Sequence, residues 1–479
     1  MKNIFLLLTT FFFSLAFSFS QSIDNIRENA AQGDAVAQYE LAIKLLEKDE
    51  GNHQTQEAPR KWLQKSARKG FAPAQSKLGS MFYITEEYDR ALYWFEKSAA
   101  QKDPFGQYYL SVMYGKGFGV EKDQDKALHW VKKSAKQGFP PAEHDLGYFY
   151  QNGIGVAEDK KEALKWYEKS AEQGFVDAQI NLGNMYSNGS GIAEDKKEGF
   201  YWMKKAAEQG HEKAQFNIAL NYAEGKGVTQ NKREALKWYK KSAEQGFLPA
   251  QNNLANMYLK GDGIPQDEKK AFFWLEKVAK QGNKNAQYAF GELYFHGKGV
   301  AENKKEAFKW YKESAEQGYG IAQNDLGNMY LRGIGTSKNE KVGFYWMEKA
   351  AEQGNENAQY TAALLYIDGI GVAQDKKEAF KWFKKSAEQG FVQAQYDLAT
   401  LYMKGEGIPQ NEEKGFHWME KAAKQGDARA QYNLGVFYFQ EIGVSQDEKI
   451  GTSWIKKARQ SGFEPAEKLW DEYELWRFD

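Results

Sequence analysis

Apolar and polar positions along this chain follow the spacing of one face of a short helix, and the pattern recurs every 36 residues. In the segment 174–209 the first apolar positions fall at i, i+4, i+7 and i+8, which predicts an amphipathic helix. These positions are Ala178, Leu182, Met185 and Tyr186. A Gly-x-Gly loop follows them, and glycines at this place predict that the first helix ends there.

A second helix is predicted to begin after Asp195 and to end at the Glu-Gln-Gly of residues 208–210. Asp195 and Glu198 have the spacing of a capping box, in which the cap side chain and the later carboxylate each accept from a free backbone amide. Gly210 stands where a left-handed C-terminal cap favours glycine. The apolar face of this helix consists of Phe200, Trp202, Met203, Ala206 and Ala207.

Tryptophan marks the repeat at a strict interval of 36 residues. A fixed period of this size indicates one unit stacked many times, so the chain is predicted to form an all-α solenoid. We expect twelve helix pairs between about residues 33 and 462, and a C-terminal cap helix within residues 463–479. The tryptophans that we expect in the core are Trp130, Trp166, Trp202, Trp238, Trp274, Trp310, Trp346, Trp382, Trp418 and Trp454.

Residues 1–20 differ from the repeats because they consist largely of one apolar run. Ser18 and Ser20 suit the −3 and −1 positions of signal-peptide cleavage before Gln21. The run is short against the ~20 residues that span a bilayer, so an uncleaved anchor is the weaker interpretation. We therefore expect an exported protein, periplasmic or secreted if bacterial, with residues 21–479 as one solenoid domain and no membrane insertion after cleavage.

Composition narrows the classes of function. The chain has 65 basic and 65 acidic residues, so it lacks the basic excess that is typical of nucleic-acid binding. It has no cysteine, and its six histidines form no cluster at metal-ligand spacing, so we expect neither a metal nor a cofactor. A stack of repeats offers an extended surface rather than a single deep pocket, which favours a protein or peptide partner.

Two runs of residues carry a family resemblance. They read Ala-Gln-x-x-Leu-Gly-x-Met-Tyr-x-x-Gly-x-Gly-Val and Lys-x-Ala-x-x-Trp-Tyr-x-Lys-Ser-Ala-x-Gln-Gly, and residues 142–174, 322–354 and 358–390 show them well. The chain resembles, over about residues 33–470, the Sel-one-like repeat family, a longer relative of the tetratricopeptide repeat. The resemblance implies a right-handed α-superhelix and an adaptor role in assembling protein complexes. Exported bacterial members of this family are linked to host interaction, envelope function or signalling.

The same resemblance suggests an alternative from another class, because the family includes cysteine-rich secreted members associated with penicillin binding and β-lactamase activity. Serine β-lactamases use a Ser-x-x-Lys nucleophile with partner motifs. The first element occurs here at Ser66 with Lys69 and at Ser453 with Lys456, but neither Ser-Asp-Asn nor Lys-Thr-Gly occurs. A non-enzymatic scaffold is therefore the prediction, and a β-lactam- or peptidoglycan-directed hydrolase is the alternative.

The first helices leave a polar strip beside their apolar face, made of the residue before the core leucine and the residue two after it. The polar strip consists of Asn181, Asn184, Asn217, Asn253, Asn256, Asp325, Asn328, Asp397 and Asn433, with Tyr288, Tyr360, Tyr396 and Tyr432 alongside. First helices line the concave groove of tetratricopeptide-like superhelices, and asparagine both donates and accepts, so this strip can hold the backbone of a peptide. Duplication of one ancestral repeat would produce the same ladder without a binding role, and the sequence leaves both explanations open.

Overall fold

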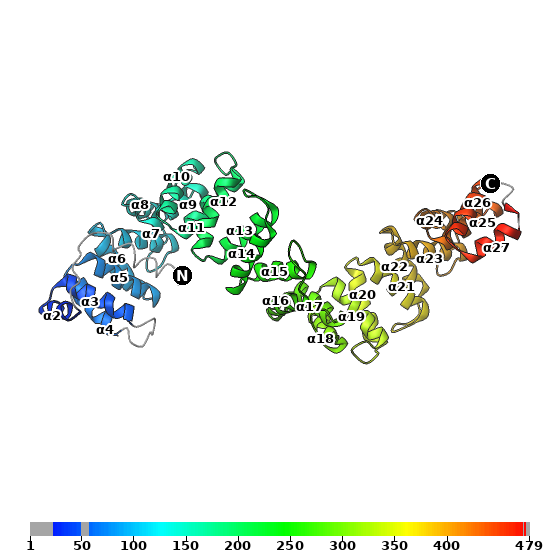
Figure 1. Cartoon of the computed structure of the whole chain (residues 1–479), viewed down its shortest axis with the longest axis horizontal. Helices are drawn as coiled ribbons and strands as arrows, with labels where there is room; N and C mark the ends of the chain where they lie inside the picture. Colours follow the sequence, from blue (N-terminus) through cyan, green and yellow to red (C-terminus); the bar gives the residue numbers. More distant parts are fainter. Residues whose placement is uncertain (1–22, 49–56, 473, 476–479) are drawn as a thin grey trace. The chain divides into compact units, whose positions relative to one another are not determined.

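The computed structural model describes residues 23–48, 57–472 and 474–475 (Figure 1). This described part of the chain contains 26 α-helices and no strand, which confirms the predicted all-α fold. The predicted signal peptide, residues 1–20, lies outside the described residues, as does the cleavage position before Gln21.

The chain divides into two compact units, and the boundary between Ser242 and Ala243 falls within α14 (Lys232–Glu244). The first unit contains α2 (Ile23–Gln32), α3 (Ala35–Lys48), α4 (Glu57–Arg68), α5 (Ala72–Ile84), α6 (Tyr88–Ala100), α7 (Pro104–Lys116), α8 (Gln124–Ala135), α9 (Pro140–Asn152), α10 (Lys160–Glu172), α11 (Val176–Asn188), α12 (Lys196–Glu208) and α13 (Glu212–Glu224). The second unit contains α15 (Leu248–Lys260), α16 (Glu268–Lys280), α17 (Lys284–His296), α18 (Lys304–Glu316), α19 (Gly320–Arg332), α20 (Glu340–Glu352), α21 (Glu356–Asp368), α22 (Lys376–Glu388), α23 (Val392–Lys404), α24 (Glu412–Lys424), α25 (Ala428–Gln440), α26 (Glu448–Gln460) and α27 (Glu464–Glu472).

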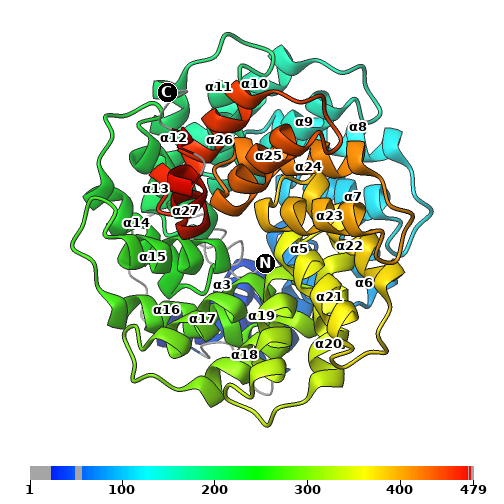
Figure 2. The ribbon, with the colours of Figure 1, turned by 90° about the vertical axis from the view of Figure 1, so that its right-hand side faces the viewer.

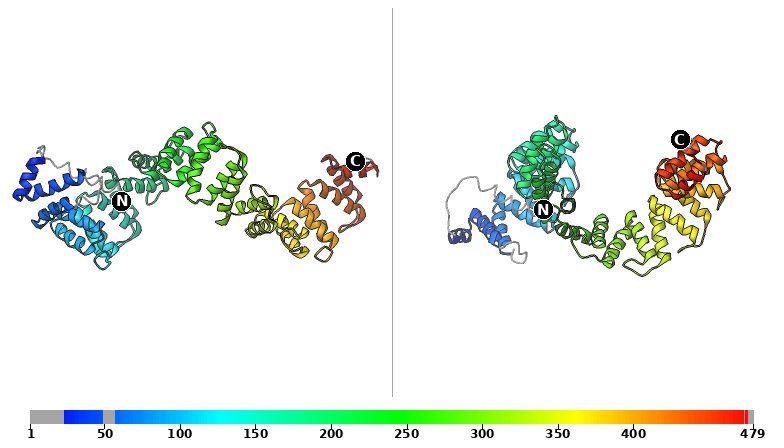
Figure 3. Two further views of the ribbon diagram at one scale, coloured as in Figure 1. Left: turned by 90° about the horizontal axis from the view of Figure 1, so that it is seen from below. Right: turned by 45° about the vertical axis from the view of Figure 1, so that its right-hand side comes forward.

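Twelve helix pairs, from α3/α4 to α25/α26, are the repeats, and successive pairs stack side by side within each unit (Figure 3). The predicted C-terminal cap helix is α27. One helix was not predicted: α2 precedes the first pair and buries Ile26 and Ala30 against α3. With only 10 residues and no partner one period away, α2 lacks the repetition on which the sequence prediction depended.

The N-terminal caps of the second helices follow only half of the predicted pattern. The Asp195 carboxylate accepts from the amides of Lys197 and Glu198 at 2.9 and 3.0 Å, as a cap should. The prediction that the Asp195 amide donates to the Glu198 carboxylate is wrong. This amide donates instead to the Tyr186 carbonyl on the first helix, at 2.8 Å. This bond between the two helices of a pair recurs in other repeats, for example Asp159 to Tyr150, Asn231 to Tyr222, Asn303 to Tyr294 and Asp375 to Tyr366.

The Gly-x-Gly loops are turns that also bring neighbouring repeats together. Gly225 ends α13 with φ of 75°, a left-handed conformation that glycine adopts without strain. Two residues later, Gly227 lies against the start of α12 in the preceding repeat, where a Cβ atom would overlap the carbonyl oxygen of Lys196. Only glycine fits this contact, so the second glycine of the loop serves packing between repeats.

A column of buried glutamines joins each repeat to the preceding one. Gln179 of α11 donates to the carbonyl of Ala171 in α10 at 3.1 Å and accepts from Gln209, the C-terminal cap of α12, at 2.9 Å. Serines hold the two helices of a pair together, as Ser170 does by donating to the Pro140 carbonyl at 2.7 Å. Because buried polar groups must be hydrogen-bonded, these contacts also fix how far each repeat rotates relative to its neighbour.

The predicted core tryptophans lie at the outer edge of the core. Four are buried, namely Trp202, Trp238, Trp274 and Trp382, and six are half-buried, namely Trp130, Trp166, Trp310, Trp346, Trp418 and Trp454. The side chain that follows each tryptophan reaches deeper, since Tyr167 and Tyr311 are among the largest fully buried side chains. Lysines cover the outer face of several rings, with the Lys169 ammonium 4.3 Å from the Trp166 ring centre.

Candidate functional site: the polar strip of the first helices

The structure places every residue of the polar strip on the first helix of a repeat, on α11, α13, α15, α19, α23 or α25. Within the second unit, the odd-numbered helices that carry the strip lie on the inner side of the curve and the even-numbered helices on the outer side (Figure 2). The strip consists of two rows that differ in their hydrogen bonding. The first row, half-buried throughout, is Asn181, Asn217, Asn253, Asp325, Asp397 and Asn433, and the second row is Asn184, Asn256 and Asn328.

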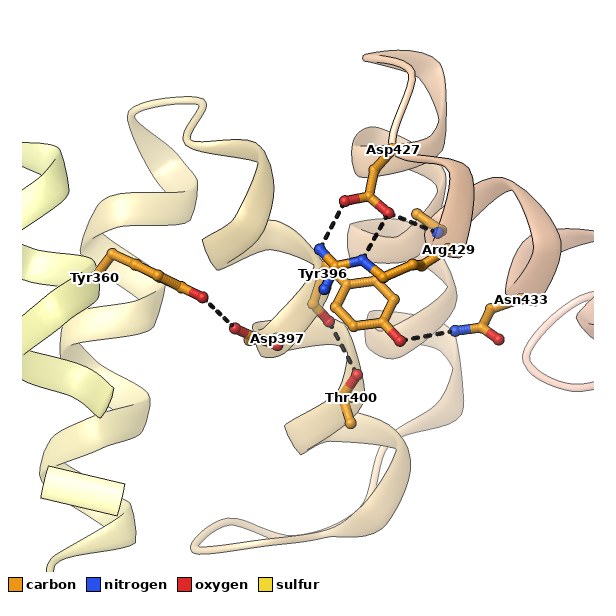
Figure 4. Close-up of polar contacts among 8 residues, drawn as sticks. Tyr360, Tyr396, Asp397, Thr400, Asp427, Arg429 and Asn433 are labelled. Carbon is orange, nitrogen blue, oxygen red and sulfur yellow. Dashed lines mark hydrogen bonds and ion pairs between the residues drawn. The ribbon is translucent and has the colours of Figure 1, made fainter. Parts of the chain in front are cut away.

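The first row makes hydrogen bonds between neighbouring repeats. The Tyr288 hydroxyl donates to the Asp325 carboxylate at 2.9 Å, and the Tyr360 hydroxyl donates to Asp397 at 3.0 Å (Figure 4). The Asn433 amide donates to the Tyr396 hydroxyl at 3.3 Å (Figure 4). In each pair the two residues are 37 positions apart, one repeat plus one residue. Three of the four predicted tyrosines, Tyr288, Tyr360 and Tyr396, are thus partners of this row. The fourth, Tyr432, packs against the ring of Phe463 instead.

The other members of the first row are also engaged. In the first unit, the Asn181 amide lies 2.9 Å from Nε2 of His144, which takes the tyrosine position of its repeat. The Asn217 amide lies 3.8 Å from Sδ of Met203. Asn253 also has a polar partner. The first row therefore holds repeats together and leaves few hydrogen-bonding groups for a ligand.

Burial determines the protonation of the tyrosine–aspartate pairs. It raises the pKa of Tyr360 to about 12, with the negative charge of Asp397 as the next cause. It also raises the pKa of the Asp397 and Asp325 carboxyls, although the hydrogen bonds from Tyr360 and Tyr288 oppose that shift. Each tyrosine consequently remains a neutral donor at neutral pH, and each carboxylate is its acceptor.

An arginine that the sequence analysis did not single out completes the network in the last repeats. The guanidinium of Arg429 lies 4.3 Å from the centre of the Tyr396 ring and pairs with Asp427 at 2.8 Å (Figure 4). Asp427 also caps α25 by accepting from the Ala430 amide at 3.0 Å. Burial works against the charge of Asp427, yet the hydrogen bonds from Arg429 and the Ala430 amide hold its pKa below the usual value.

The second row stays open. Asn184 and Asn256 are exposed, Asn328 is half-buried like the first row, and none of the three makes a side-chain hydrogen bond within the described residues. In the remaining repeats the same position carries a mixed set, including Tyr148, Leu220, Glu292, Leu364, Thr400 and Val436. Glu292 accepts from the Tyr311 hydroxyl, and the sequence analysis missed it. Its only signal in the sequence is its position, 36 residues from the second-row residues of the neighbouring repeats. The second row thus offers open amides at intervals of 72 residues, with apolar or charged side chains between them.

Comparison with known families agrees with this geometry. The model of the Sel1 repeat matches twelve consecutive segments, namely residues 35–71, 72–103, 104–139, 140–175, 176–211, 212–247, 248–283, 284–319, 320–355, 357–391, 392–427 and 428–463. The chain belongs to the Sel1 repeat family. Each matched segment contains one helix pair, so the twelve Sel1 repeats are the twelve pairs of the structure.

Two solved structures are similar to this Sel1 repeat protein over most of their own length. A protective antigen present in uropathogenic Escherichia coli strains, with an SLR fold, is 32% identical over 94% of this chain and 98% of that chain, with a TM-score of 0.70. A Sel1 repeat protein from Oxalobacter formigenes is 31% identical over 68% of this chain and 93% of that chain, with a TM-score of 0.56. No curated protein matches the sequence.

The candidate nucleophiles of the alternative, enzymatic interpretation lie in ordinary repeat positions. Ser66 is 0% exposed and its hydroxyl donates to the Ala35 carbonyl at 2.6 Å, the same bond that holds other Sel1 repeat pairs together. The ammonium of Lys69 bonds to the Gly33 carbonyl. Ser453 is exposed on α26, within an ordinary second helix. Nucleophilic catalysis by serine requires a base within hydrogen-bonding distance of the hydroxyl. Among the residues that the structure describes, neither serine has such a base.

Among the described residues, no group of three or more histidine, cysteine, aspartate or glutamate side chains is arranged to hold a metal ion. The helices of the described part are also too short or too polar to cross a membrane.

Proposed function

We propose that this Sel1 repeat protein is a non-enzymatic scaffold that holds a protein or peptide partner against the second row of the polar strip. The observation that carries the proposal is the pair of amides at Asn256 and Asn328 in the second unit, which make no side-chain hydrogen bond within the described residues. An amide side chain donates and accepts at once, and an extended backbone offers both a carbonyl and an N–H at each residue. Leu364 and Val436 continue the row and supply apolar contact for partner side chains.

The first row supports this role by making the surface rigid. Its hydrogen bonds fix neighbouring first helices relative to each other within the second unit, at Tyr288–Asp325, Tyr360–Asp397 and Tyr396–Asn433. A surface that does not reorganise loses less conformational entropy when a partner binds. The two rows thus have separate duties, one structural and one for recognition.

Export is the second part of the proposal. The apolar run within residues 1–20, with serines before Gln21, supports cleavage by signal peptidase. The E. coli relative is described as a protective antigen, which supports a place outside the cytoplasm. N-terminal sequencing of the mature protein from its native host tests this proposal. A mature chain that begins at Gln21 is expected, and an intact chain in the cytosol would contradict it.

Site-specific photocrosslinking tests the binding surface even while the partner is unidentified. A photoreactive amino acid is placed at Asn256 or Asn328, and in control variants at Lys309 or Lys381 on the exposed face of the second helices. We expect the same partner to be captured from positions 256 and 328, and not from positions 309 and 381, as identified by mass spectrometry. Capture from the two lysine positions alone would show that the outer face is the working surface.

A further inference from the structure

The column of buried glutamines has one exception. Eleven repeats carry glutamine at this position of the first helix, and all eleven donate the side-chain amide to the backbone carbonyl eight residues earlier, at 3.0–3.4 Å. The fourth repeat has Glu143 instead, at the start of α9. Its side chain is as buried as the glutamines, with 3% exposed.

One half of the glutamine's role is kept in the fourth repeat. Gln173, the C-terminal cap of α10, donates to Oε2 of Glu143 at 2.6 Å, just as Gln209 donates to Oε1 of Gln179 in the next repeat. The bond that a glutamine donates to the backbone carbonyl is not kept, because a second carboxyl oxygen takes the place of the glutamine's NH2 group. The acceptor at the equivalent place is the carbonyl of Ala135, at the end of α8. A carboxylate cannot donate to a carbonyl, whereas a protonated carboxyl can.

The surroundings of Glu143 favour the protonated form. Burial raises the pKa of its carboxyl to about 7 from an ordinary value of 4.5. Of the charged groups on α10, Lys169 opposes this shift and Glu172 adds to it, while the bond from Gln173 also opposes it. Ala135, at the end of α8, is the counterpart of the residue whose carbonyl accepts from glutamine in the other repeats, as Ala171 does from Gln179. On α9 itself His144 is paired with Asp145 at 2.9 Å.

We infer that Glu143 makes the joint between the third and fourth repeats sensitive to pH. When protonated, Glu143 donates to the Ala135 carbonyl and closes the joint between α8 and α9 as a glutamine does in every other repeat. When ionised, it loses that bond and places negative charge next to a carbonyl oxygen. The joint then opens more often, so local unfolding between α8 and α9 becomes more frequent at higher pH.

The direction of the effect follows from linkage. The folded carboxyl binds its proton more tightly than the unfolded one, so the stability of the joint is highest below about pH 4.5. That stability falls as the pH rises from about 4.5 through about 7, and it is constant above that range. A glutamine at the same place does not titrate, and the other joints with glutamine in this position should not show the change.

Amide hydrogen exchange of the full chain tests the proposal, with rates corrected for the intrinsic effect of pH. In the wild type, we expect exchange through opening of α8 and α9 to increase roughly 10- to 100-fold between pH 5 and pH 8.5. Glu143→Gln should abolish this increase and should fold normally, since eleven repeats carry glutamine there. Because this variant keeps His144, it separates the two titratable groups.

The reciprocal variant supplies the matched control. Gln179→Glu places the same carboxyl in the fifth repeat, opposite the Ala171 carbonyl, and should give α10 and α11 the pH dependence of the wild-type fourth repeat. The proposal is overturned if Glu143→Gln keeps the pH dependence of α8 and α9. It is equally overturned if Gln179→Glu exchanges at the same corrected rate at both pH values.

Discussion

The hydroxyl of Tyr360 on α21 donates a 3.0 Å hydrogen bond to the carboxylate of Asp397 on α23, which joins two neighbouring repeats through a pair that is 37 residues apart. Arg429 and Asn433 continue the contact on the next first helix by way of Tyr396. The residues that a helical wheel assigns to a binding surface are therefore partly residues that hold the surface together.

Removal of the Tyr360 hydroxyl should destabilise this part of the second unit. Tyr360→Phe leaves the half-buried Asp397 carboxylate without its donor, and an unpaired buried acceptor costs about 1–3 kcal/mol. Urea unfolding measures the loss of stability, and amide hydrogen exchange at α21–α23 locates it. Tyr360→Phe in an Asp397→Leu background should cost much less, because the acceptor is gone. Equal losses in the two backgrounds would show that the hydrogen bond contributes nothing.

Truncation of the repeat tryptophan should produce local rather than global unfolding. Trp310→Ala removes a half-buried ring whose centre lies 5.0 Å from the centre of the Phe290 ring. We expect the free energy of unfolding to fall by about 3 kcal/mol. Tyr311→Ala should cost at least as much, since Tyr311 is buried more deeply. Because repeats couple to their neighbours only, the loss should appear as an early transition confined to α17–α19. An unchanged Trp310→Ala unfolding curve would place the tryptophan outside the core.

Substitution of the second glycine of the Gly-x-Gly loop should destabilise the protein more than substitution of the glycine that follows the second helix. Gly227→Ala must displace the start of α12, because the new Cβ overlaps the Lys196 carbonyl. Gly210→Ala has a similar left-handed φ of 94° but open space around it, so it should show only the backbone cost of roughly 1 kcal/mol. Thermal unfolding compares them. Equal losses would mean that the loop does not need its close approach to the preceding repeat.

Ser66 should matter for stability and not for chemistry. Ser66→Ala removes the donor to the Ala35 carbonyl and should cost about 1–2 kcal/mol in the first repeat. A fluorescent penicillin should label neither the wild type nor this variant. Covalent labelling of the wild type that disappears in Ser66→Ala or Ser453→Ala would instead favour the hydrolase.

The helix pairs could be predicted from the sequence because their pattern recurs along the chain, so that apolar spacing and cap residues agree in most copies. The helix α2 could not, since it occurs once, before the period begins. Capping was predicted from local spacing alone, whereas the Asp195 amide finds the Tyr186 carbonyl on another helix. Tertiary partners of this kind decide which local hydrogen bonds form.

The polar strip shows the same limit at the candidate site. A helical wheel of the first helix places the positions of Asp397 and Asn328 on a common face. Such a wheel describes a single helix and carries no information on how neighbouring repeats are rotated relative to each other. That rotation brings Asp397 to Tyr360 and leaves Asn328 open. The stacking of Arg429 on Tyr396 depends on the same geometry, and a single arginine in one repeat gave the sequence no periodic signal.

Binding of the captured partner to a double variant tests the central claim most directly. Asn256→Ala with Asn328→Ala removes two open amides that make no hydrogen bond in the described part of the chain, so the unfolding curve should not change. The control, Lys309→Ala with Lys381→Ala, changes the outer face of α18 and α22. By calorimetry, the asparagine variant should bind the partner at least tenfold more weakly, and the lysine variant should bind like the wild type. Full affinity in the asparagine variant, with loss of binding in the lysine variant, would contradict recognition by the second row.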